Sequence, residues 1–119
     1  MFTTFTLVGL MAMAQTSPRL PTSMQTGNDV LATCESPNDP AFRDGLICMA
    51  WVSGVTQGLE AARRITGVCL ANLPPSATNA QYRDIIVRFL RDNPVYRHQL
   101  AGPQAAAALS RAYPCPDSN

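Results

Sequence analysis

Four cysteines in a chain of 119 residues constrain this fold more than any other feature of the sequence. They are Cys34, Cys48, Cys69 and Cys115, and no two of them form a C-x-x-C pair. In an oxidising compartment, an even number of cysteines in a short chain indicates a disulfide framework. In the cytosol the same residues would indicate a metal site or catalysis. Their meaning therefore depends on where the protein resides.

The N-terminus indicates export. Residues 5–14 form an apolar run that ends in the A-x-A cleavage pattern AMA and is too short to span a bilayer as a helix. We therefore predict a signal peptide at residues 1–14, a flexible arm rich in Pro, Ser and Thr at residues 15–26, and one helical domain at residues 27–119. The first residues carry no Lys or Arg. A truncated start or an uncleaved segment therefore stays open as an alternative.

Four cysteines allow three disulfide connectivities, and the sequence alone does not choose among them. Cys34 is expected at the end of one helix and Cys48 within the next, across the turn ESPNDPA, so these two can meet if the helices pack antiparallel. Cys69 and Cys115 would then form the long-range pair. A zinc site is not expected, because the thiols are widely separated and His98 is the only imidazole.

Helical patterns occupy most of the chain after residue 27, and no segment alternates with period two for long enough to predict a strand. Asn28 is expected to cap the first helix, and Asp39-Pro40 to begin the second. Thr78 and Gln81 form a T-x-x-Q capping box for the third. The expected helices span residues 28–34, 40–65, 79–92 and 105–113. The sequence thus predicts an all-α fold, a small bundle of four or five helices stapled by two disulfides.

The long second helix has an unusual composition. Its stretch GLICMAWVSGV, residues 45–55, is interpreted as core, with Cys48 cross-linked and Trp51 packed as an aromatic. Gly54 and Gly58 lie four residues apart, and a glycine inside a helix costs about 1 kcal/mol relative to alanine unless a close neighbour uses the space. We therefore expect another helix of the same chain to cross there, with a subunit interface as the alternative.

Composition and motifs exclude several functions. The basic residues are all Arg and are scattered singly apart from Arg63 and Arg64, so nucleic acid is not an expected partner. The sequence has no G-x-S-x-G elbow, phosphate-binding loop, H-E-x-x-H motif or EF-hand spacing. A Cys–His hydrolase would need a free thiol beside His98. No catalytic residue, metal or cofactor is therefore predicted, and we do not expect an enzyme.

Four stretches of the chain resemble a known family. In order they are GNDVLATC, CMAWVSGVTQGLE, GVCLANLPPSATNAQYRDIIVRFLRDNPVYRH and AAALSRAYPC. Their order and spacing are similar to the Rap/Tai family of type VI secretion amidase immunity proteins, over nearly all of the mature chain. The positions that carry the resemblance are Gly27, Leu31, Cys34, Cys48, Gly54, Val55, Cys69, Leu70, Val87, Phe89, Leu90, Pro94, Arg97, Tyr113, Pro114 and Cys115.

The resemblance implies a periplasmic, all-helical, disulfide-bonded protein that is often a homodimer. Such a protein binds a peptidoglycan amidase delivered by a neighbouring cell and occludes its active-site cleft, so it acts as an inhibitor. A second class stays open: a structural or accessory periplasmic protein, chaperone-like or envelope-associated, that has no toxin partner.

A partner contact is expected in the connection from Asn93 to Gln104. Tyr96, Arg97, His98 and Gln99 there offer aromatic, cationic and hydrogen-bonding groups in succession, the kinds of group that anchor interfaces. The alternative is a solvated turn in which the ring of Tyr96 packs back on the bundle.

Overall fold

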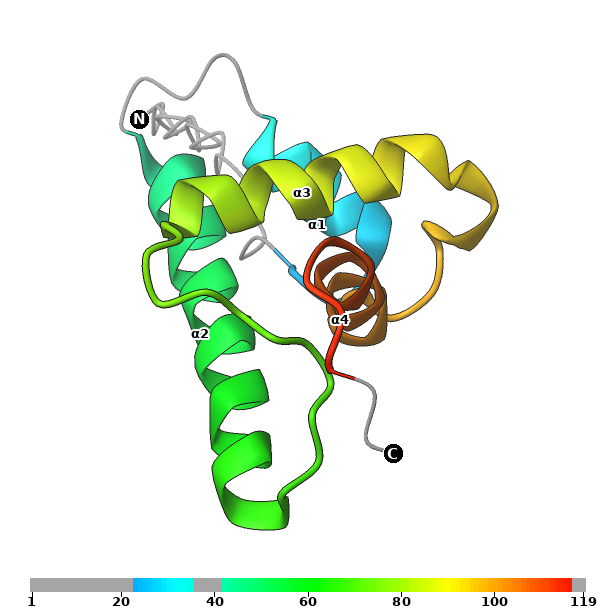
Figure 1. Ribbon diagram of the computed structural model, residues 1–119. Coiled ribbons are helices and arrows are strands. Elements are labelled where there is room, and N and C mark those ends of the chain that lie inside the picture. Colours follow the sequence, from blue (N-terminus) through cyan, green and yellow to red (C-terminus); the bar gives the residue numbers. More distant parts are fainter. Residues whose placement is uncertain (1–22, 36–41, 117–119) are drawn as a thin grey trace, which may run out of the picture.

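The structure, a computed structural model, describes residues 23–35 and 42–116. These ranges contain the helices α1 (Gly27–Cys34), α2 (Arg43–Thr66), α3 (Asn79–Asp92) and α4 (Ala101–Ala112), and the short 3-10 helix η1 (Pro94–Tyr96) (Figure 1). The one β contact among the described residues is an isolated bridge between Thr26 and Leu100. The predicted all-α class is therefore confirmed.

A reciprocal pair of side-chain hydrogen bonds begins α1. The hydroxyl of Thr26 accepts the Asp29 backbone N–H at 3.2 Å, and the Asp29 carboxylate accepts the Thr26 N–H at 2.9 Å. The bond from the Thr26 backbone is the main reason that the pKa of Asp29 lies below its usual value. The prediction that Asn28 caps this helix was wrong, because Thr26 is the cap and Asn28 lies inside the first turn.

The third helix follows the sequence prediction closely. Thr78 accepts the Gln81 N–H at 3.3 Å, and the Gln81 side chain accepts the Thr78 N–H at 2.9 Å. These bonds are the predicted capping box. The buried face of α3 consists of Tyr82, Ile86, Val87 and Leu90. Ile85 and Phe89 lie at the edge of this face and are half-buried.

The second helix starts later than predicted. Its first residue is Arg43, and the preceding residue, Phe42, has a left-handed backbone with φ of 53° that an α-helix cannot contain. The predicted start at Asp39-Pro40 lies outside the described residues. The helix ends at Thr66, and Gly67 follows with φ of 73°, a left-handed conformation that glycine adopts without strain.

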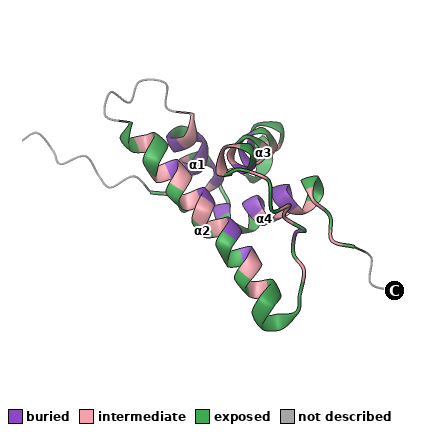
Figure 2. Cartoon of the chain, turned by 60° about the vertical axis from the view of Figure 1, so that its left-hand side comes forward, coloured by how far each residue is buried: buried purple, intermediate pink, exposed green. Residues whose placement is uncertain are grey.

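The core lies where the four α-helices meet, because every pair of them is in contact. Figure 2 shows that the buried residues lie mainly on the sides that face one another, while the C-terminal end of α2 is exposed. The least accessible large side chains are Val30, Cys48, Val52, Ile86, Leu90 and Leu109. The interpretation of residues 45–55 as core is confirmed for Cys48 and Val52, and Trp51 packs partly buried against the core. It was wrong for Leu46 and Ala50, which are exposed because they lie on the side of α2 away from the other helices.

One disulfide joins two consecutive helices, and the other joins a loop to the segment that follows the last helix. Cys34 at the end of α1 is bonded to Cys48 in α2, with a Cα–Cα distance of 5.1 Å. Cys69 in the loop after α2 is bonded to Cys115 after α4, with a Cα–Cα distance of 6.0 Å. The favoured pairing is therefore the one that the structure contains. The second disulfide ties the α2–α3 loop to the C-terminal segment.

The outer face of α2 is bare. A Cβ atom added to Gly54 or Gly58 would meet no other atom of the described chain within 4 Å, and both glycines are exposed. The expectation that a helix of the same chain crosses there was wrong, because the other helices pack on the opposite face of α2. The buried residues of α2 are Cys48, Val52, Thr56 and Leu59.

Removing either disulfide should destabilise the fold by an amount set by the loop that it closes. The two loops have sequence separations of 14 and 46 residues. The chain-entropy model then predicts losses of about 3 kcal/mol for Cys34→Ala with Cys48→Ala and about 4 kcal/mol for Cys69→Ala with Cys115→Ala. Urea unfolding followed by circular dichroism measures both losses. A reductant should destabilise the wild type and leave a variant with all four substitutions unchanged. A loss below about 1 kcal/mol for either pair would contradict this account.

Candidate partner-binding site

All four residues predicted to contact a partner lie in the connection between α3 and α4, residues 93–100. They are Tyr96, Arg97, His98 and Gln99. This α3–α4 connection consists of η1 followed by a turn, and it is shorter than the loop expected from the sequence. Residues 102–104 belong to α4, which begins at Ala101. Pro103 is tolerated in the first turn of α4 because the N–H groups of a first turn have no acceptor within the helix, so none is lost.

The N-terminus of α1 holds the α3–α4 connection by its backbone. The N–H of Gly27 donates to the carbonyl of Gln99 at 3.1 Å, and the N–H of Asn28 donates to the carbonyl of Arg97 at 2.8 Å. These N–H groups are among the first of the helix, which the helix itself cannot satisfy. The connection is therefore fixed to a helix that lies far from it in the sequence.

A buried amide supports the same connection from inside the fold. Gln104 is 6% exposed, and its Nε2 donates to the carbonyl of Gln99 at 2.9 Å and to that of Leu100 at 3.2 Å. From the sequence, Gln104 was expected at the polar end of a loop. It is instead a residue of α4 whose side chain holds the α3–α4 connection in place. The sequence could not predict this role, because a Gln after Gly-Pro is equally typical of a loop.

Several side chains of the α3–α4 connection are free to meet a partner. Val95 and Leu100 are 72% and 67% exposed, and Tyr96 is half exposed. Tyr96 is not among the buried core residues or the partly buried residues packed on the core. Val95 and Leu100 were not named as contact residues from the sequence. Their signal was available, because both are apolar residues that fit no helical stripe.

The polar members of the connection complete this surface. His98 and Gln99 are exposed, and Arg97 is half-buried. Exposed apolar residues beside polar ones are typical of interaction sites, and Tyr and Arg are among the residues that contribute most to binding energy. A backbone that is already fixed loses less conformational entropy on binding. The geometry of the connection therefore suits recognition of a macromolecule.

The cysteines limit both the chemistry and the location of the protein. All four are in disulfides, so no thiol is available for the Cys–His pair that a hydrolase based on His98 would need. Disulfides persist in oxidising compartments, which places the chain outside the cytoplasm. Within residues 23–35 and 42–116, no cluster of three His, Cys, Asp or Glu side chains could hold a metal ion.

No helix in the described part of the chain is long and apolar enough to cross a membrane.

A small disulfide-bonded helical domain that presents a fixed, exposed connection has the features of a binding protein. The family model of the Rap1a immunity proteins matches residues 26–115. The chain belongs to this family, as the resemblance in its sequence indicated. It is therefore an immunity protein, a class that binds a toxic effector. No curated protein and no solved structure matches the chain.

Gly27 should be indispensable for holding the connection. A Cβ at this position would lie 2.9 Å from Cδ2 of Leu90 and 3.1 Å from both the Arg97 carbonyl oxygen and Oε1 of Gln104. Gly27→Ala should therefore lower the free energy of unfolding by about 1–3 kcal/mol. The matched control is Gly45→Ala, which also lies in the first turn of a helix, meets open space and should leave the free energy of unfolding unchanged or raise it by up to about 1 kcal/mol. Urea unfolding measures both, and a Gly27→Ala protein as stable as the wild type would contradict the role of Gly27.

Proposed function

We propose that this protein is a periplasmic immunity protein of a type VI secretion effector, and that the effector is a peptidoglycan amidase. Membership of the Rap1a immunity family supports binding to a toxic effector. The two disulfides support an oxidising compartment, as the periplasm provides. The signal peptide at residues 1–14 stays a prediction from the sequence, since residues 1–22 lie outside the described part of the chain. The amidase is proposed from the resemblance to the Rap/Tai family.

Inhibition would follow from insertion of the α3–α4 connection into the active-site cleft of the amidase. The observation that carries this proposal is the exposure of Val95, Tyr96 and Leu100 on a backbone that α1 holds in place. An apolar tip can enter a cleft and displace its water, while Arg97 and His98 can meet polar groups at the rim. The protein would then block the substrate path without taking part in any reaction.

Truncating the tip should weaken inhibition. Tyr96→Ala combined with Arg97→Ala removes the aromatic and cationic anchors, and we expect the affinity for the effector to fall by about 2–4 kcal/mol, or roughly 30- to 1,000-fold. The chain offers a matched control, because Phe42 and Arg43 are another aromatic residue followed by an arginine, and both are exposed. The double variant Phe42→Ala with Arg43→Ala should bind as the wild type does. Calorimetric titration and an assay of amidase activity measure both variants.

Equal binding by the two double variants would disprove the role of the connection. If the wild type also failed to bind any effector, the accessory periplasmic protein would become the better account of the chain.

The proposed immunity protein would be a homodimer that pairs through the bare outer face of α2. This face contains Leu46, Ala50, Gly54, Gly58, Ala61 and Ile65, all exposed. Leu46 and Ile65 are 69% and 84% exposed, unusually high for large apolar residues of a helix. The smaller residues between them would let a second helix approach closely.

The order of residues on this face supports pairing with a second copy of the chain. Read from either end, the face presents a large apolar residue, an alanine and then a glycine. Two antiparallel copies of α2 would therefore set Leu46 against Ile65, Ala50 against Ala61, and Gly54 against Gly58 of the partner. Such self-complementarity is what a twofold-symmetric interface requires.

A large charged side chain on this face should prevent dimer formation. Gly54→Arg places a guanidinium at the closest approach of the two helices, so we expect a monomer by sedimentation equilibrium where the wild type is a dimer. Gly45→Arg is the matched control, because Gly45 is an exposed glycine of α2 that lies off this face and also borders open space. It should remain a dimer. A monomeric wild type, or a dimeric Gly54→Arg protein, would refute this interface.

A further inference from the structure

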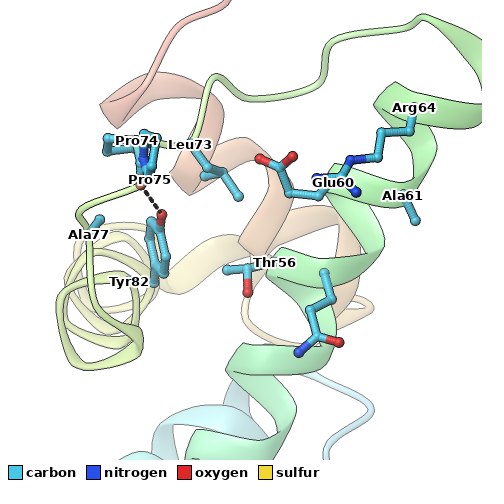
Figure 3. Close-up of a pocket in the computed structure, with 10 residues that line it drawn as sticks. Thr56, Glu60, Ala61, Arg64, Leu73, Pro74, Pro75, Ala77 and Tyr82 are labelled. Atoms are coloured by element: carbon cyan, nitrogen blue, oxygen red, sulfur yellow. Dashed lines mark hydrogen bonds between the residues drawn. The ribbon is translucent and has the colours of Figure 1, made fainter.

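A hollow of about 590 Å³ lies between the C-terminal half of α2 and the loop that follows it (Figure 3). Its volume falls within the range of about 300–1,000 Å³ typical of small-molecule sites. The lining on the α2 side includes Thr56, Glu60 and Arg64, and on the other side Leu73, Pro74 and Tyr82. The hollow borders the start of α3, whereas the α3–α4 connection follows its end, so the proposed effector contact does not use it.

Local bonds fix the wall opposite α2. The hydroxyl of Tyr82 donates to the carbonyl of Pro74 at 3.1 Å, and Figure 3 shows this bond across the hollow's edge. Further along the same loop, the N–H of Asn72 donates to the carbonyl of Tyr113 at 2.8 Å, beside the disulfide of Cys69. The hollow is therefore part of the folded structure, with two proline rings and a buried tyrosine on one side.

Two opposite charges stand at the α2 side of the hollow, one helical turn apart. Figure 3 shows the carboxylate of Glu60 directed across the hollow toward Leu73, while the guanidinium of Arg64 lies beside the stem of Glu60. Glu60 is half-buried and Arg64 is exposed. In the described part of the chain, neither side chain makes a hydrogen bond or an ion pair. Both charges thus remain available to a ligand.

We infer that this hollow binds a small zwitterion, an amino acid or a short peptide with free ends. Its ammonium group would meet the Glu60 carboxylate, and its carboxylate would meet the Arg64 guanidinium, which suits carboxylates through its paired N–H groups. An apolar side chain of the ligand would lie against Leu73 and Pro74. The Tyr82 hydroxyl, whose hydrogen is used by Pro74, has a free lone pair that can accept from the ammonium group.

The charges explain why a zwitterion fits better than a simple ion. A lone cation at Glu60 would be repelled by Arg64 one turn away, and a lone anion at Arg64 would be repelled by Glu60. A ligand that has both charges pairs with both residues. Any attraction between Glu60 and Arg64 themselves is weak because both are partly exposed to water, so the ligand can replace it at little cost in free energy. This inference stands independently of the proposed inhibition of an effector.

The test is a titration of the ¹⁵N-labelled, oxidised protein with the dipeptide alanyl-leucine, followed by NMR. We expect saturable shifts of the amide signals of residues 56–64 and 73–77. N-acetyl-alanyl-leucine and alanyl-leucine amide each lack one charge and should bind at least about tenfold more weakly. Free leucine also carries both charges and an apolar side chain, so it should shift the same signals.

Variants assign the binding to the two charges. Glu60→Gln and Arg64→Gln should each weaken binding about tenfold, while Asp92→Asn and Arg43→Gln, which alter exposed charges elsewhere, should leave it unchanged. Glu60 and Arg64 lie at the surface of α2, so we expect their variants to fold, and circular dichroism checks this for every variant. Absence of shifts for alanyl-leucine and leucine up to millimolar concentrations would overturn the inference. So would equal binding of the blocked peptides or of the Glu60 and Arg64 variants.

Discussion

The Cys34–Cys48 disulfide is the constraint on which the rest of the structure depends. The helix that it anchors, α1, has only eight residues, and a helix of that length is not stable in water without tertiary support. The bond holds the C-terminal end of α1 on α2, with Cys48 fully buried. Once α1 is placed, its first N–H groups meet the carbonyls of Gln99 and Arg97. A covalent bond at one end of α1 thus supports the exposed connection at the other.

This arrangement explains how a small domain can present a fixed binding surface. The core is shared by four short or partly exposed helices, and its volume is limited by the length of the chain. Disulfides compensate for that limit, and the Cys69–Cys115 bond does the same for the loop that lines the hollow beside α2. Membership of the Rap1a immunity family implies that the protein binds a toxic effector, and we propose this surface for that contact.

Local signals in the sequence predicted the parts of the fold that local chemistry decides. The Thr78–Gln81 box begins α3 because both side chains satisfy N–H groups within one turn. Cys34 and Cys48 were correctly paired because a short turn between two helices brings them within reach. The four residues of the candidate site were named from the sequence because they are varied polar and aromatic groups outside a helical pattern. The structure places all four in the α3–α4 connection, and their role in binding stays a prediction.

The features that the sequence did not reveal depend on contacts between distant segments. Asn28 and Thr26 are both good helix caps by residue type. Thr26 is the cap in the structure, and this agrees with the hydrogen bond that the Asn28 N–H donates to the Arg97 carbonyl, far away in the sequence. Gly-Pro at residues 102–103 was read as loop, although the first turn of a helix tolerates both. The free space beside Gly54 and Gly58 and the exposure of Val95 depend on where other helices lie.

The central claim is that this immunity protein binds and inhibits a peptidoglycan amidase. Its most direct test is to immobilise the oxidised protein, pass over it a periplasmic extract that contains secreted effectors, and identify the retained proteins by mass spectrometry. The account predicts that a peptidoglycan amidase is retained and that its activity falls when the free protein is added. Retention of envelope components alone, or of an amidase whose activity is unaffected, would contradict it.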